Sequence, residues 1–251
     1  MTNLDTNKLV WHDEFDESHI NPSNWTFQEG TGTEYGLVRW GNSEEQFYRR
    51  ENASIRDGCL VIKAKREDFG GMRYTSARLN SIQSFKYGKI AASIKLPAGD
   101  GFWPAFWLMP KESKYGAWAA SGEIDIMENR GRLPGETSGA AHYGGTYPAN
   151  TFQVGKYAFP SGIDITSFHE YSVLWCPDSI CWMVDGNQFF QMNDWGTSSE
   201  AGYLGKPTPF DQEFYVLLNL AVGGHFDEFR IPKETFTEAE MLVDYVRVYA
   251  L

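Results

Sequence analysis

The chain has 251 residues, of which 42% are hydrophobic, and its formal net charge is −11 at pH 7. This length and apolar content are sufficient for a sizeable core, either in one large all-β or α/β domain or in two small domains. Because a strongly negative surface repels nucleic acid and anionic membranes, neither is expected as a partner. A neutral ligand fits this charge better than a polyanionic one.

The cellular location is open at the level of sequence. No stretch approaches the roughly 20 apolar residues of a membrane-spanning helix. The first fifteen residues, MTNLDTNKLVWHDEF, lack a basic segment followed by an apolar run and so do not resemble a signal peptide. We expect a secreted or extracellular protein whose leader is absent from this sequence, with a cytoplasmic location as the alternative.

Alternation of apolar and polar residues with a period of two recurs along the chain and predicts β-strands. The predicted strands are, in chain order, residues 59–67, 74–81, 88–97, 170–176, 180–186, 213–224 and 241–251. Turn signals such as RDG, PAGDG and VDGN separate them. The best helix candidate is 232–241. Since no linker divides the chain, residues 1–251 are predicted to form a single all-β domain, a sandwich of two antiparallel sheets.

The aromatic segment GFWPAFWLMP has two different faces if it is a strand. Alternate residues share a face. The two sets are Phe102, Phe106 and Leu108 on one side and Trp103, Ala105 and Trp107 on the other. If the first set lines the core, two indole rings stand on the outer face, as on a binding surface. Core packing of Trp107 is the alternative.

The three cysteines do not form a disulfide framework. Cys176 and Cys181 flank the predicted turn PDSI and are candidates for a bridge across a hairpin. Buried free thiols explain the same residues, including the odd Cys59.

The segment GEIDIMEN, residues 122–129, carries three acids in a predicted strand. On a regular strand Glu123 and Asp125 point one way and Glu128 the other. A β-bulge near Ile126–Met127 shifts the phase by one residue and brings all three acids to one face. The alternative is a solvated strand edge with the acids facing water.

Two Glu on one face, with an Asp between them, suit a retaining glycosidase. In that mechanism one carboxylate attacks the anomeric carbon and the other protonates the leaving oxygen, with the carboxyl groups about 5–5.5 Å apart. The intervening Asp can form a hydrogen bond with the nucleophile and, as a nearby like charge, helps to keep the acid protonated. Tryptophan rings supply stacking surfaces for pyranose faces.

GEIDIMEN resembles the E-x-D-x-x-E signature of glycoside hydrolase family 16, in its bulged, laminarinase-like branch. Further blocks in family order are LVWHDEFD, RWGNSEEQFY, DGCLVIKAKRE, YTSARLN, YGKIAASIKLPAGDGFWPAFWLMP, FHEYSVLWCPDSICWMVDG, FDQEFYVLLNLAVGG and VDYVRVYAL. The resemblance implies a β-jelly roll with an open substrate cleft on its concave face, and retaining endo-hydrolysis of β-glucan. Residues 144–167 and 193–210 have no secure counterpart.

The resemblance also implies roles for individual residues. Glu123 matches the nucleophile, Glu128 the acid/base and Asp125 the assisting carboxylate. The matching substrate-binding positions are Asn42, Arg78, Trp103, Trp107, His142 and Asn219, with Trp118 and Trp195 in loops that rim the cleft. A purely structural histidine is the alternative for His142. No cofactor is expected for catalysis.

Many relatives carry a structural calcium ion on the convex face. The matching positions are Glu14, Gly58 and Asp244, with backbone carbonyls as much of the ligand set. Calcium prefers several oxygen ligands, and Asp244 is the one obvious side-chain donor. A solvent-facing acid is the alternative for Asp244.

We therefore expect a monomeric endo-β-1,3-glucanase that binds β-glucan polysaccharides and oligosaccharides and also accepts mixed β-1,3/1,4-glucan. A hydrolase of agar-like or carrageenan-like galactan with the same fold is one alternative, although the acidic surface disfavours the sulfated chains. A non-catalytic carbohydrate-binding module is the other. The presence of all three acids argues against it.

Overall fold

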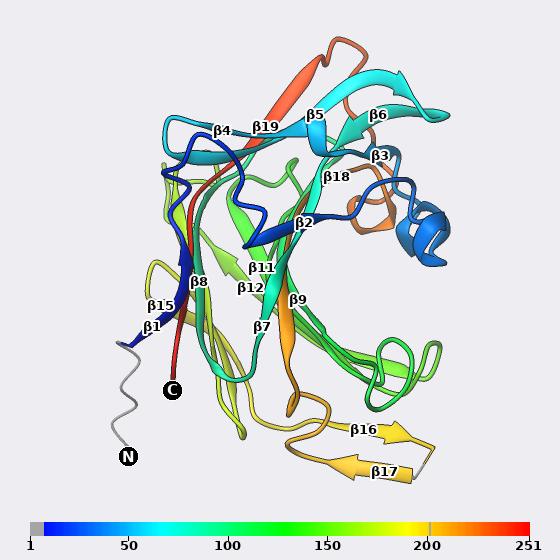
Figure 1. Cartoon of the computed structure of the whole chain (residues 1–251), viewed down its shortest axis with the longest axis vertical. Helices are drawn as coiled ribbons and strands as arrows, with labels where there is room; N and C mark the ends of the chain where they lie inside the picture. The colour runs from blue at the N-terminus through cyan, green and yellow to red at the C-terminus, as the bar shows by residue number, and fades with distance from the viewer. Residues whose placement is uncertain (1–7, 201) are drawn as a thin grey trace.

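The computed structural model describes residues 8–200 and 202–251, which fold into two β-sheets packed face to face (Figure 1). The back sheet contains β1 (Leu9–Asp13), β3 (Gln46–Tyr48), β4 (Ala53–Arg56), β5 (Cys59–Phe69), β6 (Met72–Ser76), β8 (Gly88–Lys95), β13 (His169–Trp175), β14 (Ile180–Val184), β15 (Asn187–Met192) and β19 (Glu238–Tyr249). The front sheet contains β2 (Trp25–Phe27), β7 (Arg78–Phe85), β9 (Phe102–Pro110), β10 (Glu123–Glu128), β11 (Glu136–Gly144), β12 (Asn150–Ala158), β16 (Gly196–Ser199), β17 (Gly202–Gly205) and β18 (Phe214–Val222).

The all-β sandwich predicted from the alternation is confirmed. Within residues 8–200 and 202–251, the strand pairs are antiparallel except for β3 with β6 and β11 with β16. Among the described residues the helical segments are short 3₁₀ turns: η1 (Thr33–Tyr35), η2 (Val38–Gly41), η3 (Arg50–Asn52) and η4 (His225–Asp227). None of the helices in this part of the chain is long and apolar enough to cross a membrane.

The core lies between the two sheets and is built from the inward set of each strand. On β9 this set is Phe102, Phe106 and Leu108, as the alternation predicts. They pack with inward residues of the back sheet such as Ile90 and Val173. The other set of β9, with Trp103 and Trp107, therefore stands on the outer face of the front sheet.

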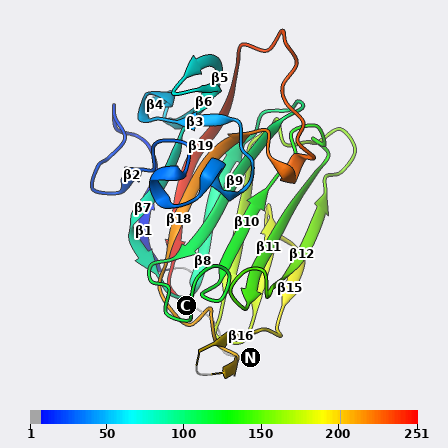
Figure 2. The same ribbon diagram turned by 90° about the vertical axis from the view of Figure 1, so that its right-hand side faces the viewer.

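This outer face is flanked by loops at both ends of the strands. In Figure 1 the segment with η1 and η2 and the hairpin of β16 and β17 project to the same side. Figure 2 looks onto the front sheet, with β18, β9, β10, β11 and β12 side by side. A ligand lying across these strands between the flanking loops meets side chains from each of them.

Two local predictions were wrong. The segment 74–81 is two strands, β6 and β7, which belong to different sheets and are separated by the buried Ala77. Residues 232–241 are not helical; β19 begins at Glu238 and pairs with Lys65. Long-range pairing overrides a local helix preference when it completes a sheet.

The cysteines are free thiols. Cys176 and Cys181 flank the β13–β14 turn, but the residue opposite Cys181 is Leu174. The pair is therefore offset along the hairpin, and the free-thiol interpretation holds.

Candidate active site

Strand β10 contains the bulge that the acid spacing predicts. Its register with β9 shifts between Asp125 and Met127, and its register with β11 shifts between Asp125 and Glu128. The extra residue falls at Ile126 and Met127, both buried. The bulge changes the phase of the strand, so Glu128 joins Glu123 and Asp125 on the outer face.

Side chains from neighbouring segments hold the bulged backbone. The indole of Trp182, from the back sheet, donates to the carbonyl of Asp125 at 2.8 Å, and the Thr137 hydroxyl donates to the carbonyl of Glu128 at 3.1 Å. Gly139 leaves room for this indole, because a Cβ there would lie 2.3 Å from Trp182. A buried carbonyl without a partner costs free energy, so these contacts stabilise the shifted phase.

Each acid has one polar side-chain partner at close range. The partners are Trp118 Nε1 for Glu123 (2.6 Å), His142 Nε2 for Asp125 (3.4 Å) and Trp103 Nε1 for Glu128 (2.9 Å). The two indole N–H groups donate to carboxylate oxygens and orient them. Ligand atoms of Glu123, Asp125 and His142 all lie within 4.8 Å of one another, so these groups act on each other electrostatically.

The electrostatics separate the roles of the groups. Burial raises the pKa of Glu128 to about 7, although the charge of His142 and the Trp103 N–H oppose the shift. Burial, with the charges of Glu123 and Glu128, raises the pKa of Asp125 well above its usual range. Burial alone would lower the pKa of His142, but the adjacent Asp125, with Glu123 and Glu128, raises it to about 9. Asp125 and His142 titrate as a pair that carries no net charge whichever residue holds the proton.

A second group of site residues lies on β7, β9 and β18. Asn219 accepts from Trp107 Nε1 at 2.8 Å and donates to the Tyr48 hydroxyl at 3.1 Å. The guanidinium of Arg78 lies between the rings of Trp40 and Trp107, at 4.4 Å and 4.8 Å from their centroids. Asn219 and Arg78 therefore fix the Trp107 ring, and Trp107 belongs to the outer face rather than to the core.

A buried carboxylate, Glu44, anchors this group and was missed in the sequence. It accepts from Asn42 Nδ2 at 3.1 Å, Gln46 Nε2 at 2.6 Å and the Tyr48 hydroxyl at 3.1 Å. Burial raises the pKa of Glu44. The signal was available, because Glu44, Gln46 and Tyr48 alternate in NSEEQFY and so share a face.

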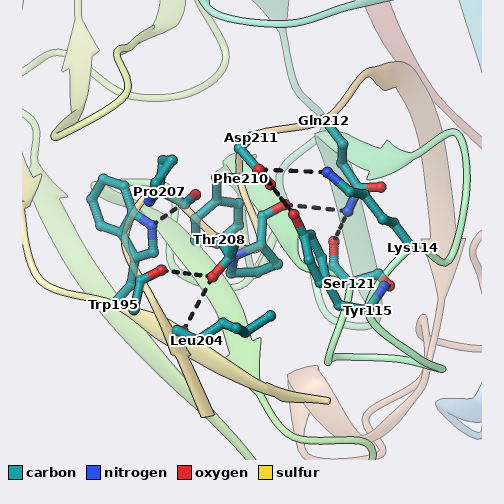
Figure 3. A network of polar contacts seen from close by, with 12 residues as sticks. Lys114, Tyr115, Ser121, Trp195, Leu204, Pro207, Thr208, Phe210, Asp211 and Gln212 are labelled. Carbon is teal, nitrogen blue, oxygen red and sulfur yellow. Dashed lines mark hydrogen bonds and ion pairs between the residues drawn. The ribbon is translucent and has the colours of Figure 1, made fainter. Parts of the chain in front are cut away.

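The loop that carries Trp118 is tied to the segment before β18 (Figure 3). The Tyr115 hydroxyl donates to Asp211 at 2.7 Å, and Gln212 Nε2 donates to the Ser121 carbonyl at 3.0 Å. The Tyr115 amide donates to the Ser121 hydroxyl at 3.0 Å. These bonds position the approach to β10 and hence Trp118 beside Glu123.

Trp195 does not rim the outer face. Its side chain is buried, packs edge-on against Phe210 and donates to the Pro207 carbonyl at 3.3 Å (Figure 3). The prediction that placed it at the cleft was wrong, because the 204–212 segment folds over it. The other predicted substrate and catalytic residues lie on the front sheet or in its flanking loops.

Comparison with known proteins identifies the family. Residues 40–246 match the model of the glycosyl hydrolases family 16. The chain belongs to this family. The resemblance seen in GEIDIMEN and in the blocks around it is thereby confirmed.

Relatives of this family-16 chain cover nearly all of it. It is 43% identical to glucan endo-1,3-beta-glucosidase A1 of Niallia circulans and 41% identical to the clotting factor G alpha subunit of Tachypleus tridentatus, each over 96% of this chain. It spans 37% and 34% of the lengths of those two proteins. The laminarinase catalytic domain of Thermotoga maritima MSB8 superposes with a TM-score of 0.84 at 35% identity, covering 97% of this chain and 98% of that one.

The residues expected to hold calcium lie near one another on the back sheet, away from the acids. Gly58 is in the turn between β4 and β5, whose Leu60 pairs with Val243 of β19. Asp244 is the next residue, where the register of β19 with β8 shifts. Both carboxylate oxygens of Glu14 accept from Arg247, at 2.9 Å and 2.7 Å, and this pairing lowers the pKa of Glu14. The carboxylate of Glu14 is therefore already paired with a positively charged side chain of the protein itself.

Proposed function

We propose that this chain is a retaining endo-glycosidase that cleaves laminarin-type β-1,3-glucan and also accepts mixed β-1,3/1,4-glucan. The observation that carries the proposal is the bulged β10, which brings Glu123, Asp125 and Glu128 to one face. The similarity to a glucan endo-1,3-beta-glucosidase and to a laminarinase supports the substrate class.

The geometry supports a double displacement. Glu128, with its pKa of about 7, protonates the glycosidic oxygen while the carboxylate of Glu123 attacks the anomeric carbon. This breaks the glycosidic bond and forms a covalent glycosyl-enzyme. Glu128, now a carboxylate, takes a proton from water, whose oxygen displaces Glu123 from the sugar with net retention.

The partners of the acids hold the reacting oxygens in place. The Trp118 N–H orients Glu123 toward the sugar, and the Trp103 N–H orients Glu128. The neutral pair of Asp125 and His142 separates the two Glu without adding net charge. In the first step Glu128 holds a proton while Glu123 acts as a carboxylate, and the raised pKa of Glu128 suits it to the role of the acid.

The test is reducing-sugar release from laminarin, mixed-linkage glucan, curdlan and agarose, with the oligosaccharide products resolved over time. We expect fast formation of mixed oligomers from laminarin and slower cleavage of mixed-linkage glucan. Cleavage of agarose alone would move the chain to the galactan alternative. No cleavage of any of the four polysaccharides would favour the binding-module alternative.

The roles of the two Glu are tested by Glu123→Gln and Glu128→Gln. Each substitution keeps the shape of the side chain and removes the nucleophile or the acid, so we expect turnover to fall by roughly 10³-fold or more. Binding of laminarin, measured by calorimetry, is expected to persist. Wild-type-like turnover in either variant would contradict the assignment.

We further propose a secreted monomer in which residues 1–251 form a single catalytic domain; residues 1–7 lie outside the described part of the chain. We also propose a structural calcium ion held by the main chain at Glu14 and Gly58 and by Asp244. What supports the ion is the convergence of these positions and the irregular register at Asp244. No catalytic step involves it.

Removal of calcium by EDTA is expected to lower the melting temperature of the wild type, because a ligand that binds only the folded state stabilises it. Asp244→Asn is expected to weaken this response, and restored calcium should reverse the effect in the wild type. A melting temperature that does not respond to EDTA or to added calcium would refute the site.

A further inference from the structure

Strand β12, which lies in the segment 144–167 without a secure counterpart in the family blocks, extends the face that carries the acids. It pairs along its whole length with β11, with Phe152 opposite His142. His142 is itself opposite Glu123 on β10. Directly paired residues on adjacent strands share a face, so Phe152 stands on the outer face in the same row as Glu123.

The next row gives the same result for Val154. It pairs with Ala140, and Ala140 pairs with Asp125. The residue between the two apolar side chains, Gln153, points the other way: its Nε2 donates to the Tyr143 hydroxyl at 2.7 Å. Alternation along β12 therefore presents Phe152 and Val154 together on the side of the acids.

The two side chains are uncovered in the structure. Phe152 is 57% exposed and Val154 is 48% exposed. The ring of Phe152 stacks on His142, with centroids 5.4 Å apart and planes at 27°. His142 in turn lies 5.6 Å from the ring of Trp118, which donates to Glu123. The rings of Trp118, His142 and Phe152 thus form a continuous row of contacts from Glu123 to β12.

The outer-face position between the acids and this apolar pair is occupied by a small, buried side chain, Ala140. Ala140 separates Asp125 from Val154, and its methyl group does not rise above the sheet as a long side chain would. Strand β12 lies two spacings from β10, roughly 10 Å, and a pyranose unit is about one such spacing long. A glucan chain crossing the strands over β11 therefore places its second sugar from the cleavage point over Phe152.

We propose that Phe152 and Val154 form a sugar-binding subsite on β12, which holds the second glucosyl unit from the scissile bond on the β11 side. The inference rests on the proposed glucanase function. The sugar chain is the expected occupant of this subsite, because Phe152 lies in the same row as His142 and Glu123. Pyranose faces also stack on aromatic rings.

The experiment compares wild type, Phe152→Ala and Phe152→Tyr on end-labelled β-1,3-gluco-oligosaccharides of three to six units. We expect Phe152→Ala to lower kcat/KM roughly tenfold for the oligosaccharides long enough to reach β12. It should spare the shortest one and shift the main cleavage point along the longer ones. Phe152→Tyr, which keeps the ring, is expected to retain the wild-type pattern.

The matched control is Phe168→Ala, which removes a 43% exposed ring just before β13 in the back sheet. It should change neither the rate nor the cleavage point.

Unchanged chain-length dependence in Phe152→Ala, with an active wild type, would overturn the subsite alone. An inactive wild type on every oligosaccharide would remove the proposed function and the subsite together. A wild-type dimer that Phe152→Ala dissociates, seen by sedimentation, would assign this face to a second copy instead.

Discussion

At the scale of single residues, the two Glu differ through their surroundings rather than through their chemistry. Glu128 lies beside buried apolar residues of the bulge and receives a single N–H from Trp103. Its pKa of about 7 leaves a large protonated fraction in neutral solution. A protonated carboxyl beside an ionised one is the arrangement that general-acid cleavage of a glycosidic bond needs.

Replacement of Trp103 by Phe should shift the alkaline limb of the pH–activity profile to higher pH. An N–H that donates to a carboxylate stabilises its charged form, so loss of this donor raises the pKa of Glu128. Activity that requires protonated Glu128 then persists to higher pH in plots of kcat/KM. Trp107→Phe is the control, since its N–H donates to Asn219 and not to an acid, and we expect it to leave the limb in place. A limb that stays in place in Trp103→Phe would contradict the role of this N–H.

At the scale of elements, the bulge in β10 is maintained from the opposite sheet. Trp182 of β14 crosses the core to donate to the Asp125 carbonyl, where the shifted ladder leaves this group available. Trp175 of β13 makes a similar bond, to the Phe210 carbonyl at 3.1 Å, which belongs to the segment before β18 and not to the catalytic strand. Both indoles are fully buried. The two residues therefore differ in that only Trp182 bonds the backbone of β10 directly.

We expect Trp182→Phe and Trp175→Phe each to lower the free energy of unfolding by about 1–3 kcal/mol, because each removes buried ring volume and leaves a carbonyl unpaired. The loss of kcat should differ: roughly tenfold or more in Trp182→Phe, whose indole bonds β10 itself, and smaller in Trp175→Phe. Urea denaturation and laminarin turnover measure the two quantities. Equal losses of kcat would show that the bulge does not depend on Trp182.

The elements also show where sequence reasoning succeeds and where it ends. Alternation predicts strands, the outward position of Trp103 and the bulge in β10, since these depend on neighbours along one strand. It does not predict that Phe152 lies opposite His142, because strand pairing at the edge depends on loop lengths and the whole sheet. Trp195 and residues 232–241 were misjudged because contacts between segments decide both: the 204–212 segment covers the indole, and β19 pairs with β5.

At the scale of the whole molecule, the catalytic acids add negative charge that lowers the stability of the folded state. The chain already carries a net charge of −11, and the outer face adds three acids within a short segment. A carboxyl whose pKa is higher in the folded state than in the unfolded state makes folding less favourable once the unfolded chain ionises. The active site is therefore a local cost in stability, which the core between the two sheets offsets.

Glu128 allows this cost to be measured. Below pH 4 the residue is protonated in both states and contributes nothing. As pH rises from the ordinary Glu value through about 7, the unfolded state releases its proton first, so the stability of the wild type should fall. Glu128→Gln cannot ionise, and we expect it to be about 3 kcal/mol more stable than the wild type at pH 8. Urea titrations at pH 4 and pH 8 measure the difference, which should be near zero at the lower pH, and Glu112→Gln, on the exposed surface, is the control. A Glu128→Gln variant less stable than the wild type at pH 8 would mean that the ionised carboxylate is stabilised by its neighbours, and the source of the general acid would then lie elsewhere.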